Sequence, residues 1–426
     1  MSALYAARTQ ARPGAEVSVA VLEKMPRPAR KIMISGKGRC NLSNIKEWND
    51  FCTHIHGKAQ FCKNAFFNLT PQGVIDLFGS IGLPTVLERG DRAFPASYRA
   101  SDVVDCLVNA CLGAGVKIEC EFEVTEVLRL PEGGFRINSK DGRTYLCRAL
   151  VIATGGLSYP GTGSSGDGYR WAAEAGHRIV STFPSLTALV PSGYKNGKAD
   201  SLRHIDRITP LSELGRALCG VQLKNVGATL SIDGTTVQEE FGDIDFTDGG
   251  IEGPIGFQLS RRAVKALVNG SKVRLAIDLK YGVKAEELSS RIRELGASIQ
   301  ADSRSRGLGE KARKNILLGK LMPRELIPGF LMANSGRSLS QALKEWNFDI
   351  EGYVGYERAV VTAGGVSTDE LLPKTMESRL VKGLYFCGEV LDLDCDTGGY
   401  NLQIAFSTGA LAGQSAARGL IEAGRH

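Results

Sequence analysis

The chain has 426 residues, of which 43% are hydrophobic and 23% charged, as expected for a soluble globular protein of two or three domains. Its net charge of +6 is modest. Its densest basic stretch, 304–314, holds no aromatic residues and is interpreted as a solvated helix start or loop, so we expect no nucleic-acid partner. No apolar run is long enough to span a membrane, and the 51 glycines show no period, which excludes collagen-like and low-complexity chains.

The first predicted elements are a helix over 2–12 and a short buried strand over 17–22, separated by a Pro-Gly turn. The strand ends at Glu23, so this order is typical of the second half of a dinucleotide-binding unit. In such units an acidic residue about 20 positions after the glycine loop binds the ribose. Counting back from Glu23 reaches the start of the chain. We therefore expect the first strand and its G-x-G-x-x-G loop to precede the numbered sequence, through a start placed too late rather than through loss of the loop.

The rest of the chain has two kinds of predicted secondary-structure pattern, an α/β pattern and a run of strands followed by helices. Predicted elements are a helix over 101–113, strands over 116–130, 135–150, 149–153, 221–232, 237–246 and 273–279, helices over 285–295 and 338–346, strands over 359–362 and 384–387, and a helix over 401–420. Asp233-Gly234 is predicted to be a hairpin turn. The pattern predicts one α/β domain, 1–186 and 356–426, interrupted at 187–355 by a domain of strands followed by helices.

The segment 31–44 (KIMISGKGRCNLSN) has the most specific pattern in the chain. It combines glycines, cations and hydrogen-bonding side chains within a few positions: Lys31, Ser35, Gly36, Lys37, Gly38, Arg39 and Asn41. A pyrophosphate or the edge of a flavin requires this combination. A tight polar turn would explain the glycines and the asparagine, but it would not explain three converging cations.

Two further glycine segments follow buried strands. The strand 150–153 leads into Thr154-Gly155-Gly156, where small residues let a cofactor pass at the carboxyl edge of a parallel sheet. The next loop, 158–168, contains a formal G-x-G-x-x-G at Gly161, Gly163 and Gly166. Because no strand leads directly into it, we interpret it as a loop lying along the cofactor and not as the phosphate loop.

The third glycine-rich cluster spans 383–399 and precedes the final helix. The predicted strand ends at Gly388-Glu389, which would bring a carboxylate to a cofactor sugar. Gly398 and Gly399 open a helix whose N-terminal amides suit the negative charge that a reduced flavin gathers at N1 and O2. Small residues at 409, 412, 413 and 416 are expected to pack this helix tightly on the sheet. A plain C-terminal helix with a glycine turn is the alternative.

Cysteine and histidine patterns are uninformative about metals. The ten cysteines form no C-x-x-C pair and follow no secretory signal, so we expect reduced thiols in a cytoplasmic protein. His54 and His56 lie near Cys52 and Cys62, but their spacing fits no common zinc pattern. We interpret them as ordinary loop residues and expect no metal.

An ordered set of motifs closely resembles a bacterial family across nearly the whole chain. The motifs are SGKGRCN, RAFPAS, ATGG, SYPGTGSSGDGY, PSLTALVP, FTDGGIEGP, TAGGVS, TMESRL and GLYFCGEVLDLDCDTGGYNLQ. The family comprises NAD(P)/FAD-dependent oxidoreductases, with aminoacetone oxidase-like and dehydro-bile-acid reductase-like flavoproteins among its members. The resemblance implies a discontinuous Rossmann-like FAD-binding domain of the glutathione reductase type, with an inserted β-barrel-like and helical domain.

The resemblance also implies a set of FAD-binding residues, with Glu23 at the adenosine ribose. The full expected set is Glu23, Lys24, Lys31, Ser35, Gly36, Gly38, Arg39, Cys40, Asn41, Val124, Ala153, Thr154, Gly155, Gly156, Gly388, Glu389, Asp392, Gly398, Gly399, Tyr400, Asn401, Leu402 and Gln403. The inserted domain would cover the reactive face of the flavin and select a small-molecule substrate.

The expected activity is hydride transfer between NAD(P)H and an organic substrate through flavin N5, reducing an activated double bond. No side chain is assigned as catalytic acid or base, although Tyr400, Arg92 and Tyr159 are candidates for a proton donor or carbonyl clamp. One alternative is an oxidase of small amines that uses oxygen. Another is a non-catalytic remnant that has lost FAD and acts as a binding protein. The pattern does not indicate an oligomeric state.

Overall fold

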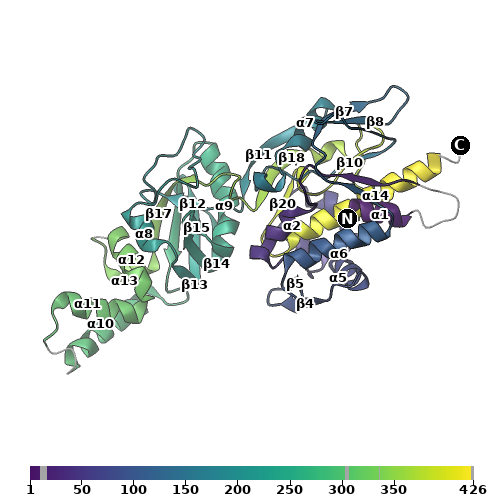
Figure 1. Cartoon of the computed structure of the whole chain (residues 1–426). Helices are drawn as coiled ribbons and strands as arrows, with labels where there is room; N and C mark the ends of the chain where they lie inside the picture. Colours follow the sequence, from purple (N-terminus) through teal and green to yellow (C-terminus); the bar gives the residue numbers. More distant parts are fainter. Residues whose placement is uncertain (10–16, 303–306, 335, 424–426) are drawn as a thin grey trace. The chain divides into compact units, whose positions relative to one another are not determined.

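A computed structural model of the protein describes residues 1–9, 17–302, 307–334 and 336–423. The chain divides into two compact units, one formed by Met1–Phe183 with Val361–His426 and the other by Pro184–Val360 (Figure 1). The inserted unit was expected at 187–355. It begins and ends a few residues outside those bounds, at Pro184 and Val360.

Parallel strand pairs form the α/β part of the first unit. They are β1 (Ala20–Leu22) with β6 (Lys117–Glu119), and β10 (Leu150–Ile152) with β19 (Leu384–Phe386). Strand β1 is shorter than the predicted 17–22, since its ladder with β6 starts only at Ala20. Strands β1, β10 and β19 end where predicted site segments begin, so their carboxyl ends carry Glu23, Ala153 and Cys387.

Helix α14 (Tyr400–Ala423) runs through the core of this unit. The other helices are α1 (Ser2–Thr9), α2 (Arg30–Ile34), α3 (Trp48–Phe51), α4 (Lys63–Asn68), α5 (Pro71–Ser80), α6 (Ala100–Gly113) and α7 (Asp167–Glu174). Helices α1 and α14 lie side by side (Figure 1). A Cβ on Gly413 would lie 2.0 Å from Ser2 O, so Gly413 packs against α1 and not against the sheet as predicted. The part of the first predicted helix beyond Thr9 lies outside the described residues.

Antiparallel layers and short turns complete the first unit. The layers are β7 (Val124–Arg129), β8 (Phe135–Ser139) and β9 (Thr144–Cys147); β2 (Ser43–Asn44), β5 (Arg92–Pro95) and β4 (Thr85–Glu88); β3 (Ile55–Gly57) with β20 (Leu393–Cys395); and β11 (Ile179–Ser185) with β18 (Val361–Val366). The 3₁₀ turns are η1 (Ser35–Gly38), η2 (Cys52–His54), η3 (Ala59–Cys62), η4 (Pro160–Thr162), η7 (Thr368–Glu370) and η8 (Gly388–Val390). The β3–β20 pairing joins segments far apart in sequence and carries part of the site.

The second unit is built on a closed barrel in the order β12-β15-β14-β13-β16-β17. Its strands are β12 (Leu189–Pro191), β13 (Gln222–Ile232), β14 (Thr235–Thr247), β15 (Gly250–Glu252), β16 (Val273–Asp278) and β17 (Trp346–Tyr353). The predicted hairpin turn is confirmed, since Asp233 and Gly234 have φ values of 49° and 86° and connect β13 to β14. This architecture confirms the expected α/β domain with an inserted barrel.

Trp346 corrects one prediction. It was placed at the end of a helix over 338–346, but α13 covers only Leu339–Lys344 and Trp346 begins β17. Its indole is fully buried against Phe330 and Phe348, with ring centroids 5.3 and 4.8 Å away. Tertiary packing therefore overrides the local helical pattern at this position.

The helices of the second unit are α8 (Glu213–Leu218), α9 (Gly253–Val268), α10 (Ala285–Ala301), α11 (Glu310–Leu321), α12 (Ile327–Ala333) and α13, with η6 (Arg324–Leu326) before α12. Helix α9 was not predicted, although Pro254 in its first turn and buried Ile255, Leu259 and Ala263 form a regular apolar face. Of the basic stretch 304–314, residues 304–306 lie outside the described residues, and the rest leads into α11. Within the described ranges, no helix is long and apolar enough to cross a membrane.

Candidate functional site

The turn after α2 has an unusual backbone. Gly36, Lys37 and Gly38 have φ values of 56°, 56° and 86°, and Cys40 follows at 58°. The amide of Cys40 closes the turn by donating to Ser35 O at 3.1 Å. Consecutive left-handed residues orient neighbouring peptide dipoles as in anion-binding backbone nests. A Cβ on Gly38 would meet no atom within 4 Å, so there is open space beside this turn.

Asn41 lies directly after this turn and faces the glycine pair before α14. Its Oδ1 atom is buried and has no hydrogen-bond partner among the described residues. Gly399 has a φ of 100°, and a Cβ there would lie 2.8 Å from Asn41 Oδ1 and 2.4 Å from the backbone of Ser43. Leaving a buried amide oxygen unpaired costs about 1–3 kcal/mol, so Asn41 Oδ1 is suited to accept a hydrogen bond from a ligand.

The carboxylate of Glu389 is engaged within the protein. Lys31 Nζ lies 2.5 Å from Glu389 Oε2, and the amide of Thr362 donates to Oε1 at 2.9 Å. Thr362 Oγ1 in turn accepts from the amides of Leu157 and Ser158 at 2.8 and 3.1 Å. These contacts join α2, β18 and the loop after β10, so Lys31 and Glu389 frame the site rather than extend into open space.

Glu23 lies at the carboxyl end of β1. Its Oε1 accepts from the amide of Met25 at 2.9 Å, and burial raises the pKa of its carboxyl. The adjacent Lys24 places Nζ 2.6 Å from Asp167 Oδ2 and also contacts Ser165. Lys24 therefore ties the glycine-rich loop 158–168 to the end of β1, beside the expected ribose-binding carboxylate.

The two arginines singled out in the sequence support a small sheet. The guanidinium of Arg39 pairs with Glu88 and lies 4.5 Å from the ring centroids of both Phe94 and Tyr98. Arg92 donates from Nε to the carbonyl of residue 89 at 3.0 Å. Both arginine side chains therefore make their contacts with residues in or next to β4 and β5.

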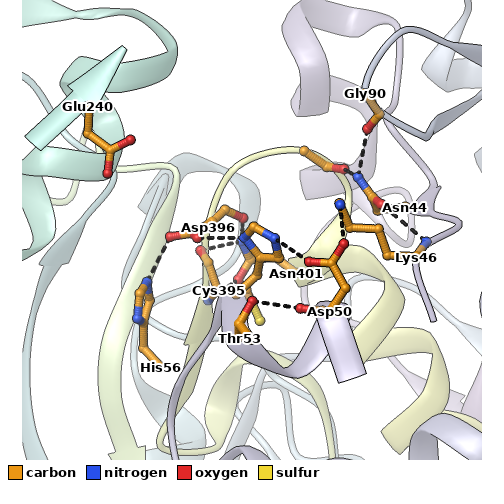
Figure 2. Close-up of polar contacts among 12 residues, drawn as sticks. Asn44, Lys46, Asp50, Thr53, His56, Gly90, Glu240, Cys395, Asp396 and Asn401 are labelled. Atoms are coloured by element: carbon orange, nitrogen blue, oxygen red, sulfur yellow. Dashed lines mark hydrogen bonds and ion pairs between the residues drawn. The ribbon is translucent and has the colours of Figure 1, made fainter. Parts of the chain in front are cut away.

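Polar side chains at the start of α14 are also satisfied internally. Asn401 Oδ1 accepts from the amide of Cys395 at 2.9 Å, and its Nδ2 donates to the carbonyls of Cys395 and Asp396 at 2.9 and 3.1 Å (Figure 2). Gln403, fully buried, accepts from Ser43 Oγ at 2.5 Å and donates to the carbonyl of residue 69 at 2.9 Å. Both residues fix the loop that ends in Gly398-Gly399.

The remaining expected residues line strand ends and turns. Val124 begins β7, Ala153 and Thr154 follow β10, Gly155 and Gly156 continue that loop, Gly388 begins η8, Asp392 precedes β20, and Leu402 packs against the apolar cluster around Phe406. The amide of Gly388 donates to Thr408 Oγ1 at 3.0 Å, and the amide of Asp392 donates to Val366 O at 3.0 Å. Ser35 Oγ donates to Ile32 O at 2.7 Å and helps to end α2.

His54 and His56, which were predicted to be ordinary loop residues, form a polar cluster with Asp396 beside this loop. His54 Nδ1 and His56 Nε2 each lie 2.9 Å from an oxygen of Asp396, one histidine to each oxygen. Figure 2 shows the contact between His56 and Asp396. Burial alone would raise the pKa of Asp396, but the hydrogen bonds from both histidines outweigh it and lower that pKa to about 2. The His54 ring stacks on Tyr400, with centroids 4.3 Å apart and planes 20° from parallel. The two residues are therefore part of a polar cluster and are not ordinary loop residues.

The i, i+2 spacing of the histidines was the available signal, although His54 ends the 3₁₀ turn η2 and only His56 lies in strand β3. Their partner Asp396 arrives through the β3–β20 ladder, in which Ile55 pairs with Cys395. In the part of the chain that the structure describes, no group of His, Cys, Asp and Glu is arranged to hold a metal ion.

A Rossmann-type unit with glycine loops at its strand ends, interrupted by a barrel, defines the class of the protein as an FAD-dependent oxidoreductase. The chain belongs to the HI0933-like family, because the model of the HI0933-like protein Rossmann domain matches residues 1–415. This membership confirms the family and the enzyme class that the motifs indicated.

Individual relatives cover most of the chain. It is 31% identical over 425 residues to a 3-dehydro-bile acid delta(4,6)-reductase of Clostridium scindens, covering 98% of this chain and 97% of that protein. It is 31% identical over 390 residues to a ribosomal RNA dihydrouridine synthase of Escherichia coli strain K12, covering 92% and 90%. Among solved structures, a 3-ketosteroid-delta4-(5alpha)-dehydrogenase from Rhodococcus jostii RHA1 aligns with a TM-score of 0.44 and 13% identity over 98% of this chain and 94% of that one.

Proposed function

We propose that the protein reduces a carbon–carbon double bond conjugated to a carbonyl group, using FAD and with NAD(P)H as the electron donor. The observation that carries this proposal is the likeness to two relatives of different substrate type. One is named for reducing delta(4,6) bonds of a 3-dehydro bile acid, and the other for forming dihydrouridine. Both names describe saturation of a ring double bond conjugated to a carbonyl.

The residues present fit the cofactor. Asn41 Oδ1 is a buried acceptor without a partner, and the donors of a flavin or its ribityl chain could satisfy it. The left-handed turn at Gly36 to Gly38, with open space beside it, suits phosphate or flavin oxygens. We propose that this turn, Asn41, Glu23 and the loops 153–156 and 398–399 hold FAD directly. Lys31, Arg39, Glu389, Asn401 and Gln403 would keep those loops in place.

Bound FAD would supply a hydride acceptor and donor at its N5 position. The chain itself must bind the substrate carbonyl, exclude water and supply a proton, because reduction of a conjugated double bond adds one hydride and one proton. The N-terminus of α14, opened by Gly399, adds a partial positive charge that would favour negative charge on the reduced ring.

The test begins with the visible spectrum of the purified chain, before and after FAD is added. We expect flavin bands, bleaching by NADPH without oxygen, and reoxidation by a 3-oxo-delta(4,6) steroid or by uridine-containing RNA. The two acceptors distinguish the substrate types of the two relatives. Bleaching by a small amine with reoxidation only by oxygen would instead support an amine oxidase, and a protein that binds no FAD would overturn the proposal.

A further inference from the structure

We infer that His54 donates the proton that completes this reduction, from its Nε2 atom to the α-carbon of the conjugated substrate. The inference rests on the proposed function. Bound FAD, once reduced by NAD(P)H, would supply the hydride for the β-carbon, and the π electron pair of the double bond would move toward the α-carbon and carbonyl. A second C–H bond then forms at the α-carbon as the Nε2–H bond of His54 breaks, which leaves a neutral imidazole that water reprotonates.

The contacts of His54 distinguish its two nitrogens. Nδ1 lies 2.9 Å from Asp396 Oδ2, within hydrogen-bond distance of a carboxylate that accepts but does not donate when ionised. This contact keeps a proton on Nδ1 and leaves Nε2 as the nitrogen that gains and loses one. An imidazole oriented through one nitrogen by a carboxylate is the arrangement that acid–base catalysis uses.

The Nε2 atom has the longer of the two carboxylate contacts that the ring makes. The nearest carboxylate oxygen is Asp50 Oδ1 at 3.5 Å, too long for a good hydrogen bond, and the His54 side chain is 26% exposed. Asp50 is also paired with Lys46, which lies 3.9 Å from Asp91. The long contact to Asp50 leaves Nε2 without a close hydrogen-bond partner that would block proton transfer to a substrate.

His54 also lies beside the proposed cofactor loop. Its ring stacks on Tyr400, the first residue of α14, immediately after Gly398-Gly399. The Tyr400 hydroxyl is a poorer donor, because burial raises its pKa further above neutrality. His56 has no ring contact with Tyr400. It contributes the second hydrogen bond to Asp396, so we assign His56 and Asp396 to positioning.

The experiment uses the FAD-loaded full chain and follows the two halves of the reaction separately by stopped flow. His54→Gln is expected to bind FAD and to be bleached by NADPH as the wild type is. Its reoxidation by the conjugated acceptor should slow by about a hundredfold or more, because the general acid is missing. His204→Gln is the matched control, since His204 is a partly exposed histidine 3.4 Å from Glu357 in the other unit.

Two further readouts separate a proton donor from a structural residue. With the wild type in D₂O, deuterium should appear at the α-carbon and reoxidation should slow, whereas His54→Gln should have little such isotope effect. In the FAD-free protein, two-bond ¹H–¹⁵N spectra should show the neutral His54 ring protonated on Nδ1, and Asp396→Asn should weaken this preference.

The outcomes discriminate between the two proposals. Reoxidation of His54→Gln within twofold of the wild type, with the same solvent isotope effect, would overturn the role of His54 and leave the proposed function standing. A neutral ring protonated on Nε2 would also overturn that role, independently of any turnover. A wild-type flavin that no conjugated acceptor reoxidises would overturn the proposed function itself, and the role of His54 with it.

Discussion

His54 and Asp396 form a hydrogen-bonded pair, with Nδ1 of the histidine 2.9 Å from Oδ2 of the carboxylate. The histidine precedes β3 and the aspartate follows β20, and the antiparallel ladder between these strands is what brings them together. The glycine loop before α14 and the segment around residue 54 are therefore coupled through one carboxylate. Disturbing that carboxylate should affect both stability and the proposed site.

Replacing Asp396 with Asn should lower the free energy of unfolding in a pH-dependent way. Partial burial raises the pKa of this carboxyl, but the hydrogen bonds from the two histidines outweigh it and lower the pKa from 3.8 to about 2. Its ionised form therefore stabilises the folded state above pH 4, and this contribution disappears as the pH falls through about 2. In urea unfolding at pH 7, we expect the free energy of unfolding of Asp396→Asn to be about 1–2 kcal/mol below that of the wild type. This difference between the two proteins should become smaller below pH 4. Asp349→Asn, in an exposed pair with Arg274, should change stability by less than about 1 kcal/mol, and equal losses in both variants would contradict the prediction.

The substitution Asn401→Asp keeps the shape of the side chain but removes its two donors. The new carboxylate would face the carbonyls of Cys395 and Asp396, which Nδ2 now satisfies. We expect a loss of about 2 kcal/mol in thermal or urea unfolding and at least about tenfold weaker FAD binding by fluorescence titration. The exposed Asn269→Asp serves as the control, and FAD affinity that is unchanged in Asn401→Asp would show that the loop does not need this residue.

The substitution Gly399→Ala should be strongly unfavourable. Gly399 has a φ of 100°, and a Cβ would lie 2.4 Å from the backbone of Ser43, which cannot move aside easily. We expect a loss of about 3 kcal/mol or more, measured by urea unfolding, together with loss of bound FAD. Gly79→Ala, in α5 with no atom within 4 Å of the new Cβ, should instead be neutral or slightly stabilising. If the two variants lost similar free energy of unfolding, the close approach of Gly399 to the backbone of Ser43 would be refuted.

Thr362→Val should loosen the loop that follows β10. The buried Thr362 hydroxyl accepts from the amides of Leu157 and Ser158 and contacts Ser158 Oγ at 2.9 Å. Valine has nearly the same shape but cannot accept, so these buried donors would lose a partner. We expect a loss of about 2–4 kcal/mol in the free energy of unfolding, against little change for the exposed Thr235→Val. A loss below about 0.5 kcal/mol would mean that another acceptor replaces the hydroxyl.

Local patterns in the sequence were sufficient for much of the architecture. Apolar runs bounded by glycines identified β10 and β19, and Asp233-Gly234 identified the β13–β14 hairpin. These predictions depend only on residues a few positions apart, as do turn and strand preferences. The start of β17 was missed because packing of Trp346 in the barrel overrides the local helical pattern. Helix α9 was missed although its sequence carries a regular apolar face and a proline in the first turn.

The candidate site, like the fold, was predictable from the sequence only where its features are local. Local sequence features, glycines with cations and polar residues beside them, identified the turn at Gly36 to Gly38 and the loop at Gly399, since left-handed backbone is favoured by the residue type itself. Only the tertiary structure decided which side chains meet, as it paired Lys31 with Glu389 and His54 and His56 with Asp396. Such ion pairs and hydrogen bonds act over a few ångströms between residues hundreds of positions apart. The register of long-range strand pairing, and not the chain's local composition, therefore determines them.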